Sequence, residues 1–262
     1  MKRPTGKALI SALSGALLAI GLLPAVCQAD AITLTGTVRD FNFAGTSYNG
    51  VAGHPDFQSK SGDDRGIVQT TLGADGKPVY ASANANPTIT SAASFYQWYH
   101  DDPTVNRTGT VSITLNKISP TLYQYSNSSF FPIDGALLAQ PDGGHNFAFT
   151  TEFHTSFTYL AANNDTFSFT GDDDVFVFIN KTLAIDLGGV HGAESASVSL
   201  NSLGLVDGKD YSLDVFQAER HTSQSNFAIT TSLQLSNPDP TVPEPTSLAL
   251  LALGLIGLAL RR

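Results

Sequence analysis

Short runs in which apolar and polar residues alternate recur along almost the whole chain between residues 30 and 236. A period of two places successive side chains on opposite faces of a β-strand, so each run predicts a strand. No stretch of this region shows the longer period of an extended amphipathic helix. We therefore predict an all-β fold, either a sandwich or a barrel. The runs are Ile32–Val38, Val111–Leu115, Phe147–Phe153, Thr166–Thr170, Val175–Ile179, Thr182–Asp186, Ser195–Leu200, Tyr211–Gln217 and Asn226–Leu235.

The region from Asn42 to Ser94 has a different character. It is rich in Gly, Ser, Ala, Asn and Pro and contains few periodic apolar residues. Such residues favour turns and loops because they tolerate or impose special backbone angles. We expect this region to pack over the β-domain as long loops, with turns at Ala74-Asp75-Gly76 and Asn86-Pro87.

Three consecutive aspartates, Asp172 to Asp174, stand directly before the apolar run Val175–Ile179 in the stretch GDDDVFVFINKTLAIDLGGVH. Aspartate is unfavourable in strands, and neighbouring carboxylates repel each other. Ca²⁺ prefers oxygen ligands and would remove that repulsion, provided that a loop conformation lets the carboxylates converge. The run does not follow the spacing of an EF-hand loop. The alternative is that the aspartates accept hydrogen bonds from nearby backbone amides.

The first 29 residues have the form of a secretory signal peptide. Basic residues in MKRPTGK precede the apolar stretch Ala8–Ala25, and small residues at Cys27 and Ala29 fit signal peptidase cleavage after Ala29. A lipid anchor on Cys27 is the competing interpretation, but Val26 is large for that motif. Cys27 is the only cysteine, so the mature chain is predicted to hold no disulfide and no cysteine nucleophile.

The C-terminal residues 237–262 form a proline-rich spacer and an apolar segment. Pro243-Glu244-Pro245 precedes the apolar run Leu248–Leu260, which ends in Arg261-Arg262. An ordinary membrane anchor is one interpretation, although thirteen apolar residues fall short of the roughly 20 that cross a bilayer. The order of features resembles the PEP-CTERM sorting signal of Gram-negative bacteria that make exopolysaccharide. That resemblance implies processing by an exosortase after transient membrane insertion of the segment, or retention as an anchor.

The mature region is strongly acidic. Residues 30–242 hold 9 Lys and Arg against 22 Asp and Glu, which gives a net charge of −13. Nucleic-acid binding requires a basic surface, so that class of function is excluded. An acidic exported domain suits divalent cations and neutral glycans instead.

Ordered motifs across nearly the whole mature chain resemble the fibro-slime domain, a bacterial extracellular module related to PA14. The resemblance implies a single antiparallel PA14-like β-sandwich with long loops over residues 30–236. In PA14-like adhesin lectins an Asp-Asp pair binds Ca²⁺ and a glycan together, which implies Asp172 and Asp173 here, with Asp174 beside them and Asn226 assisting. The motifs are VRDF at 38–41, HPDF at 54–57, DGKPVY at 75–80, FYQWY at 95–99, FFPIDG at 130–135, HNF at 145–147, AERHTS at 218–223 and SNF at 225–227, together with the stretch 171–191.

One departure from that family concerns the turn after Val175–Ile179. Related hairpins have Asn-Gly where this chain has Asn180-Lys181. Lysine at a positive φ costs energy that glycine avoids, so we expect a turn other than type I′.

Other candidate residues allow two interpretations. Trp98, the only tryptophan, could stack on a sugar ring or could anchor the long loops to the core. Glu219 and Arg220 could belong to a catalytic cluster, but a structural ion pair, with each other or with Asp186, is the simpler interpretation. His145, His191 and His221 match no short zinc motif and are expected to form loop hydrogen bonds.

These observations predict a secreted or surface-associated protein of an exopolysaccharide matrix that binds a glycan through calcium and is not an enzyme. Asp172, Asp173, Asn226 and Trp98 are the predicted ligand-binding residues, and Asp172, Asp173, Asp174 and Asn226 the predicted metal ligands. A structural matrix protein in which calcium only stabilises the fold is the second hypothesis. A carbohydrate-active enzyme, which would need a second acid facing Glu219 across a cleft, is the third.

Overall fold

The computed structural model describes residues 30–81, 86–138 and 144–236. The predicted signal peptide and the sorting segment, with Cys27 and the Pro-Glu-Pro motif, lie outside the described residues. Within the described residues, no helix combines the length and the apolar character needed to cross a membrane.

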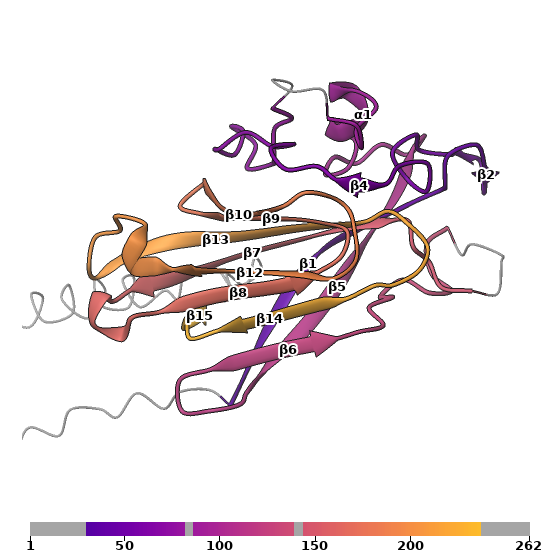
Figure 1. The fold of residues 1–262 in the computed structure, drawn as a ribbon. Helices are drawn as coiled ribbons and strands as arrows, with labels where there is room; N and C mark the ends of the chain where they lie inside the picture. Colours follow the sequence, from indigo (N-terminus) through magenta and orange to yellow (C-terminus); the bar gives the residue numbers. More distant parts are fainter. Residues whose placement is uncertain (1–29, 82–85, 139–143, 237–262) are drawn as a thin grey trace, which may run out of the picture.

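One large antiparallel sheet of eleven strands forms the body of the molecule (Figure 1). The strand order is β10-β9-β13-β7-β1-β5-β6-β14-β8-β12, and β15 adds to β7. The strands are β1 (Ala31–Phe41), β5 (Asn106–Lys117), β6 (Tyr123–Asn127), β7 (Phe149–Tyr159), β8 (Thr166–Gly171), β9 (Asp174–Ile179), β10 (Thr182–Leu187), β12 (Glu194–Ser199), β13 (Lys209–Glu219), β14 (Phe227–Thr231) and β15 (Leu235–Ser236).

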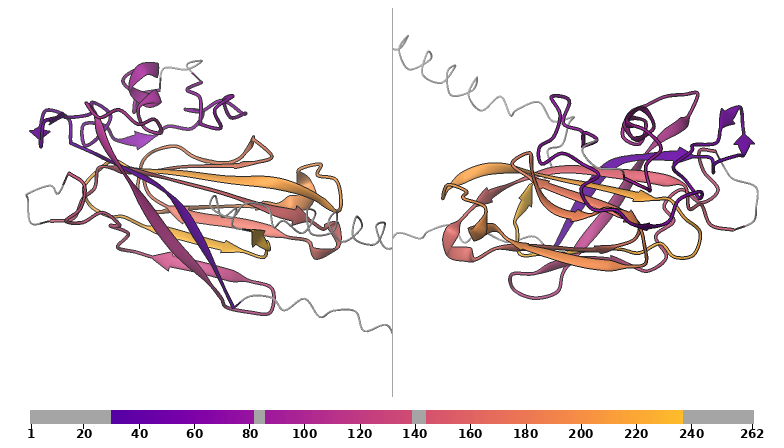
Figure 2. Two further views of the ribbon diagram at one scale, coloured as in Figure 1. Left: turned by 180° about the vertical axis from the view of Figure 1, so that it is seen from behind. Right: turned by 45° about the horizontal axis from the view of Figure 1, so that its top comes forward.

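The sheet curls over so that it makes both layers of a sandwich. The two ends of the strand order, β10 and β12, lie against each other, and β1 and β5 run obliquely between the layers (Figure 2). Apolar side chains from both layers meet in an inner core, where the rings of Phe153 on β7 and Phe227 on β14 pack edge to face with centroids 5.8 Å apart. The all-β antiparallel sandwich predicted from the alternating runs is thus confirmed.

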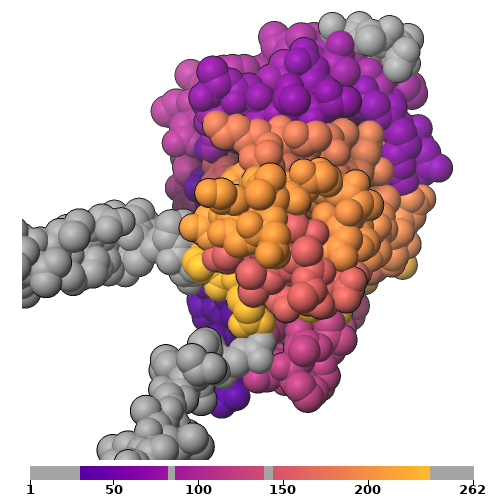
Figure 3. Space-filling model, turned by 90° about the vertical axis from the view of Figure 1, so that its left-hand side faces the viewer, coloured from indigo at the N-terminus to yellow at the C-terminus, as the bar shows by residue number. Residues whose placement is uncertain are grey.

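Residues 42–105, which we call the insertion, cover the outer face of β9 and β13. The insertion holds β2 (Ser47–Tyr48), β3 (Val51–Ala52), β4 (Gly62–Asp63) and the short helix α1 (Ala92–Tyr96). β4 pairs with β11 (Gly189–Val190), and Figure 3 shows the violet insertion in direct contact with the orange later strands. Beneath the insertion lies a second apolar cluster, the outer core, and the prediction of long loops packed over the sandwich is confirmed.

β9 is buried on both faces because it lies between the two cores. Val177 faces the inner core, whereas Phe176 and Phe178 face the outer core. Its connection to β10 carries positive φ angles of 52° at Asn180 and 62° at Lys181. Two consecutive positive φ angles are what a type I′ turn requires, so the expectation of a different turn is wrong. Lys181 adopts this conformation because the antiparallel pairing of β9 and β10 fixes the hairpin.

Buried ionic contacts also tie the insertion to the sheet. Glu152 on β7, almost fully buried, accepts hydrogen bonds from Lys77 Nζ at 2.6 Å and from Arg39 Nη1 at 3.1 Å. Lys77 belongs to the insertion and Arg39 to β1, so one carboxylate connects three parts of the chain. Such a network stabilises only when its charges are fully paired, as they are here.

Candidate functional site

Asp172 and Asp173 occupy the link between β8 and β9 and reach a small polar cavity. The cavity has a volume of about 190 Å³. Four segments form it: the link itself, the end of β11 with the loop that follows, the loop between β13 and β14, and the part of the chain around Ser61. Its lining residues are Ser61, Asp172, Asp173, Val190, His191, Gly192, His221, Ser223 and Gln224.

Asn226 holds Asp172 in place. The Asn226 backbone amide donates to Asp172 Oδ1, and its side-chain Nδ2 donates to Asp172 Oδ2 at 2.7 Å. Two donors from one residue fix both oxygens of the carboxylate. The structure therefore brings together Asn226 and Asp172, which the family resemblance had paired.

Asp173 is held by two backbone amides from different loops. The amides of His191 and Arg220 donate to its two carboxylate oxygens at 3.1 and 2.9 Å. Burial, together with the charges of Asp174 and Asp172, raises the pKa of Asp173 to about 7 despite these hydrogen bonds and the charge of Arg220. An ionised Asp173 is therefore costly unless a further positive charge lies beside it.

Asp174 has a different role from its two neighbours. Its Oδ2 accepts a hydrogen bond from Arg220 Nε at 2.6 Å, in an ion pair whose two side chains have no solvent exposure. Its Oδ1 accepts from the Gly189 amide at 2.7 Å. Gly189 has a φ of 121° and lies so close to β4 that a side chain would clash with Asp64 and Gly62. Because Asp174 has no solvent exposure, is paired with Arg220 and does not line the cavity, it is placed as a structural anion, and its predicted role as a metal ligand is corrected.

Arg220 is the cation of this structural network. Its Nη1 donates to the carbonyl oxygens of Thr88 and Asp56, and its guanidinium lies 4.5 Å from the centroid of the Trp98 ring. Arg220 thus pairs with Asp174 and not with Asp186, whose carboxylate accepts the Gly66 and Gly188 amides. The structural ion pair expected for Arg220 exists, with a partner that the sequence analysis did not name.

The prediction that Trp98 binds a sugar is wrong. Its side chain has no solvent exposure, and its Nε1 donates to Asp56 Oδ2 at 3.2 Å. Phe57 and Phe95 pack on the ring, and Arg220 covers a face. The alternative interpretation is correct: Trp98 anchors the insertion in the outer core.

Glu219 lies beneath the cavity without lining it. Only 1% of the residue is exposed, and neither carboxylate oxygen accepts a well-formed hydrogen bond from the described residues. Burial, followed by the charges of Asp173 and Asp172, raises the pKa of Glu219 well above its ordinary value, and the polar groups of Ser225 and His221 do not offset this. An ion pair was expected for Glu219, but Arg220 pairs with Asp174 instead, so a buried carboxylate without a paired cation is a feature that the sequence did not predict.

Two of the three histidines share the cavity. His191 and His221 line it, whereas His145 lies in a separate hollow with Asp134. Within the described part of the chain, no three His, Cys, Asp or Glu side chains are arranged as a metal-binding group. The structure thus does not assemble a three-histidine zinc site. A calcium ion would have to use amide and carbonyl oxygens in addition to the carboxylates, which are ordinary ligands for that ion.

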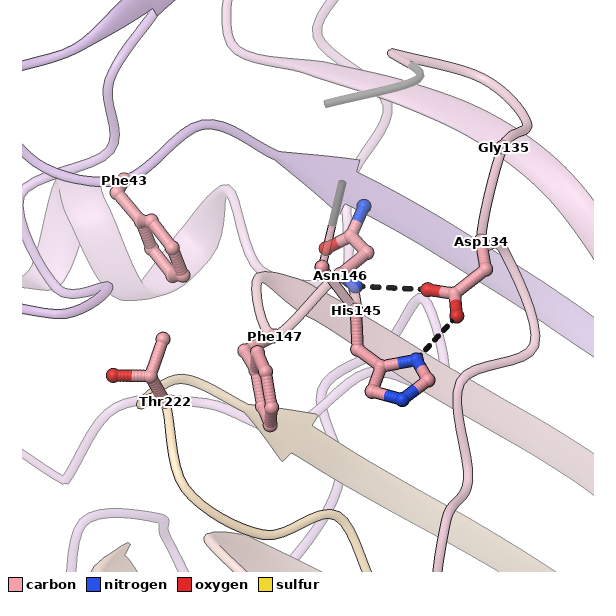
Figure 4. Close-up of a pocket in the computed structure, with 8 residues that line it drawn as sticks. Phe43, Asp134, Gly135, His145, Asn146, Phe147 and Thr222 are labelled. Carbon is pink, nitrogen blue, oxygen red and sulfur yellow. Dashed lines mark hydrogen bonds and ion pairs between the residues drawn. The ribbon is translucent and has the colours of Figure 1, made fainter. Parts of the chain in front are cut away.

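The separate hollow borders the loop between β13 and β14 at Thr222 (Figure 4). It has a volume of about 170 Å³, and Phe43, Phe147 and Thr222 face one another across it. His145 Nδ1 lies 2.6 Å from Asp134 Oδ2, and its ring stacks on Phe131. His145 is therefore a loop hydrogen-bonding residue, as expected.

Two lining residues carried no signal in the sequence. Ser61 and Gln224 lie in loops without periodicity, and only the fold brings them to the aspartates. The pair Gly188-Gly189 before His191 was the available hint, because adjacent glycines after a strand indicate a close backbone approach.

Comparison with known proteins connects this geometry to a family. The model of the PA14 domain matches residues 134–247, and the PEP-CTERM protein-sorting motif matches residues 241–262. These matches confirm the predicted resemblances to the PA14 family and to the sorting signal. The PA14 match includes Asp172, Asp173 and Asn226 and excludes the whole insertion.

Relatives among curated proteins come from Dictyostelium discoideum. Protein psiQ is 42% identical over 200 residues, which cover 70% of this chain and 20% of psiQ. Protein psiD is 39% identical over 230 residues, which cover 80% of this chain and 43% of psiD. The chain thus spans less than half the length of these relatives. Among solved structures, a PA14 sugar-binding domain from an RTX adhesin overlaps 77% of this chain and 91% of its own, at 10% identity and a TM-score of 0.30.

Proposed function

From the match of residues 134–247 to the PA14 domain and of residues 241–262 to the PEP-CTERM protein-sorting motif, we propose that this chain is an exported surface protein that binds a glycan through calcium. The proposed site is the cavity at Asp172 and Asp173. The sorting motif supports export and processing by an exosortase, and the acidic mature region excludes a nucleic-acid partner. We further propose that the glycan belongs to an extracellular polysaccharide matrix.

The observation that carries the proposal is a group of acidic side chains without a matching cation. Glu219 is buried, and among the described residues no cation is paired with it; its pKa and that of Asp173 are raised by burial and by the neighbouring carboxylates. The nearest guanidinium, that of Arg220, is already paired with Asp174. A buried group of ionised carboxylates is costly for folding; protonation reduces that cost, and a divalent cation would reduce it while the carboxylates stay ionised.

The residues present fit a calcium ion. Asp172 and Asp173 offer carboxylate oxygens to the cavity, and Asn226, which does not line it, holds Asp172 through its Nδ2. When bound, the ion would neutralise the carboxylates and offer coordination positions to sugar hydroxyls. The protein's own part is to hold these side chains in place, through Asn226 and through the amides of His191 and Arg220.

The rim of the cavity supplies groups suited to hydroxyl recognition. Ser61, Ser223 and Gln224 can both donate and accept hydrogen bonds, as sugar hydroxyls do. Gln58 fixes the loop that carries them, because its side chain bonds to the Thr222 amide at 3.0 Å and to the Thr222 hydroxyl at 2.9 Å. A rim held in this way reduces the ordering cost of binding.

An enzymatic role receives less support from the geometry. Glu219, the acid that such a role would use, is buried and does not line the cavity. General acid catalysis requires the group to come within hydrogen-bond reach of the substrate. We therefore propose a binding function for the site.

The test is binding of the purified protein to an array of glycans and bacterial exopolysaccharides, in Ca²⁺ and again in EDTA. We expect binding that depends on calcium and is lost in Asp173→Ala. Asp134→Ala is the matched control, because it removes a carboxylate from the neighbouring hollow and should leave this binding intact.

A thermal melt separates a glycan site from a purely structural calcium site. At a calcium concentration 100 times Kd we expect stabilisation of roughly 2.7 kcal/mol, which Asp173→Ala abolishes. Stabilisation without glycan binding on any array surface would leave calcium a structural role and overturn the lectin proposal. If calcium neither stabilises the protein nor supports glycan binding, the proposed calcium site itself is overturned.

A further inference from the structure

A second candidate binding surface lies on the insertion beside α1, the helix at the top of Figure 1. Two hollows of about 460 and 640 Å³ share Ala92, Tyr96 and His100, so together they form one groove around these residues. Their volumes fall within the range of small-molecule sites, about 300–1,000 Å³. No residue of this groove lines the cavity at Asp172 and Asp173.

The centre of the groove is an exposed aromatic ring. Tyr96 is 57% exposed, although large aromatic side chains are usually covered in a folded domain. The His100 ring stacks on one face of Tyr96, with centroids 3.5 Å apart and an angle of 11° between the planes. The exposed remainder of the ring is therefore available to a ligand.

Neighbouring hydrogen bonds fix this stacked pair. His100 Nδ1 lies 2.7 Å from the Tyr96 carbonyl oxygen, and His100 Nε2 lies 2.9 Å from Asp75 Oδ2. Asp75 is itself fixed by the Lys77 amide at 3.1 Å. Because both sides of the imidazole are held, the tyrosine is presented as a rigid platform, which lowers the entropy lost on binding.

The walls of the groove combine apolar surface with hydrogen-bond acceptors. Apolar side chains of Pro78, Val79 and Tyr80 lie along one hollow. Asp101 and Asp102 lie at the other, where Thr108 donates to Asp101 at 2.9 Å and Thr104 donates to Asp102 at 2.6 Å. A flat apolar platform with fixed carboxylates at its edge matches a sugar ring, which has an apolar C–H face and hydroxyl groups around its rim.

The charge of the groove selects among ligands. Asp75, Asp101 and Asp102 line it; Asp101 is paired with Arg39 and Asp75 with His100, so the carboxylates outnumber the basic groups that contact them. An anionic ligand such as a uronate, a sulfated sugar or a phosphate would be repelled. A purely apolar ligand would leave the fixed carboxylates desolvated without a partner.

We propose that this groove is a second glycan-binding site, independent of calcium, which stacks a neutral hexose residue on Tyr96. The site is separate from the calcium cavity and stands whether or not that cavity binds a glycan. A chain with both sites can hold two saccharide segments at once, which strengthens attachment to a polysaccharide by multivalency.

The test is affinity electrophoresis of the purified full-length chain in EDTA. The gels contain a neutral β-glucan, a neutral mannan or a neutral galactan, with polygalacturonate as the anionic comparison. We expect at least one neutral polysaccharide to retard the protein, and Tyr96→Ala to weaken that interaction at least tenfold. Tyr96→Phe keeps the ring and should stay within about threefold of the parent.

Val206→Ala is the matched control, since Val206 is exposed to a similar degree and lies outside the groove. Asp173→Ala should still be retarded in EDTA, which separates this site from the calcium cavity. The proposal is overturned if no neutral polysaccharide retards the protein in EDTA, if Tyr96→Ala and Val206→Ala behave alike, or if polygalacturonate binds best. If Asp173→Ala loses only the binding that requires calcium, that loss supports the proposed calcium cavity. It does not bear on the groove at Tyr96, which is tested in EDTA.

Discussion

The inner and outer cores share β9 and β13 but are built by different means. In the inner core, regularly alternating apolar residues from the two layers face each other, and the strands position them. In the outer core, aromatic rings from irregular loops pack on the back of the sheet, among buried charged groups such as Arg220 and Glu152. The inner core follows from a repeating pattern, whereas the outer core depends on a few specific contacts.

This difference indicates where single substitutions should cost most. A periodic core contains many similar contacts, and it can adjust to a lost methyl group. A core that contains buried ions cannot adjust in this way, since one lost partner leaves an unpaired charge. The outer core also carries both proposed binding surfaces, because residues of the insertion line each of them.

Loss of the buried arginine should have the largest effect. Arg220→Met would leave the buried carboxylate of Asp174 without its guanidinium partner. It would also remove the hydrogen bonds that Arg220 Nη1 donates to the carbonyl oxygens of Asp56 and Thr88. We expect the free energy of unfolding to fall by about 4 kcal/mol, measured by urea denaturation. The double variant Arg220→Met/Asp174→Leu should regain at least half of that loss, because no charge remains buried. A loss below 1 kcal/mol in the single variant would show that the pair does not hold the outer core.

Truncation of one outer-core ring tests whether the two cores unfold together. Phe178→Ala should cost about 3 kcal/mol, near the lower end for buried phenylalanine. Trp98 is the only tryptophan and lies in the outer core, so its fluorescence reports on that core alone, while far-UV circular dichroism reports on the sheet. Because β9 and β13 belong to both cores, we expect the two signals to change at the same urea concentration.

The matched substitution on the inner side of the same strand is Val177→Ala. It should cost less than Phe178→Ala, and the two signals should coincide for it as well. A fluorescence transition that precedes the dichroism transition in Phe178→Ala would show instead that the insertion unfolds as a separate unit.

The carboxylate that connects the insertion to the sheet predicts a pH dependence. Burial alone would raise the pKa of Glu152, but interactions with His154, Arg39 and Lys77 lower it from 4.5 to about 2. A lowered pKa contributes stability that is present above pH 4.5 and is lost as the pH falls through 2. We expect Glu152→Gln to lose about 2 kcal/mol at pH 7 and to show a smaller decline in stability between pH 4.5 and 2 than the parent.

His154 gives the opposite limb of the pH profile. Burial would lower its pKa, but Asp214 and Glu152 raise it to about 9. Its contribution is present below pH 6.5 and is lost as the pH rises through 9. Because the side chain is 42% exposed, solvent screens the effect, and we expect only a slight decline in melting temperature above pH 8.

The Glu152 prediction has its own contradicting outcome. If stability falls between pH 4.5 and 2 as steeply in Glu152→Gln as in the parent, that fall does not come from Glu152.

The strands could be predicted to the extent that alternation specifies them. Each alternating run corresponds to an observed strand, although β7 begins at Phe149 and the last run divides into β14 and β15. β6 was missed because its sequence YQYSN is polar and only Tyr123 is fully buried. The outer core could not be predicted in detail, since its loops have no period and its contacts join residues far apart in sequence.

The site was predictable only in part, because contacts between residues far apart in sequence also decide the roles of its side chains. Asp172, Asp173 and Asn226 were named from their resemblance to a family, and the structure brings Asn226 to Asp172. Asp174 and Trp98 were misassigned because their roles are set by one distant residue, Arg220, which contacts both. Sequence spacing contains no information about such a contact.

The smallest effect is expected where an ion pair lies at the surface. Arg65 pairs with Glu194, and each side chain is more than a third exposed. Water already solvates both charges, so their attraction is weak and salt screens it further. Glu194→Gln should therefore lower the free energy of unfolding by less than about 1 kcal/mol, and the difference should shrink further in 1 M NaCl. The same change of carboxylate to amide at the buried position, Asp174→Asn, should cost several times more and should be nearly insensitive to salt. Equal costs at the two positions would mean that burial does not decide the value of an ion pair here, and the distinction between the two ways of building the cores would fail with it.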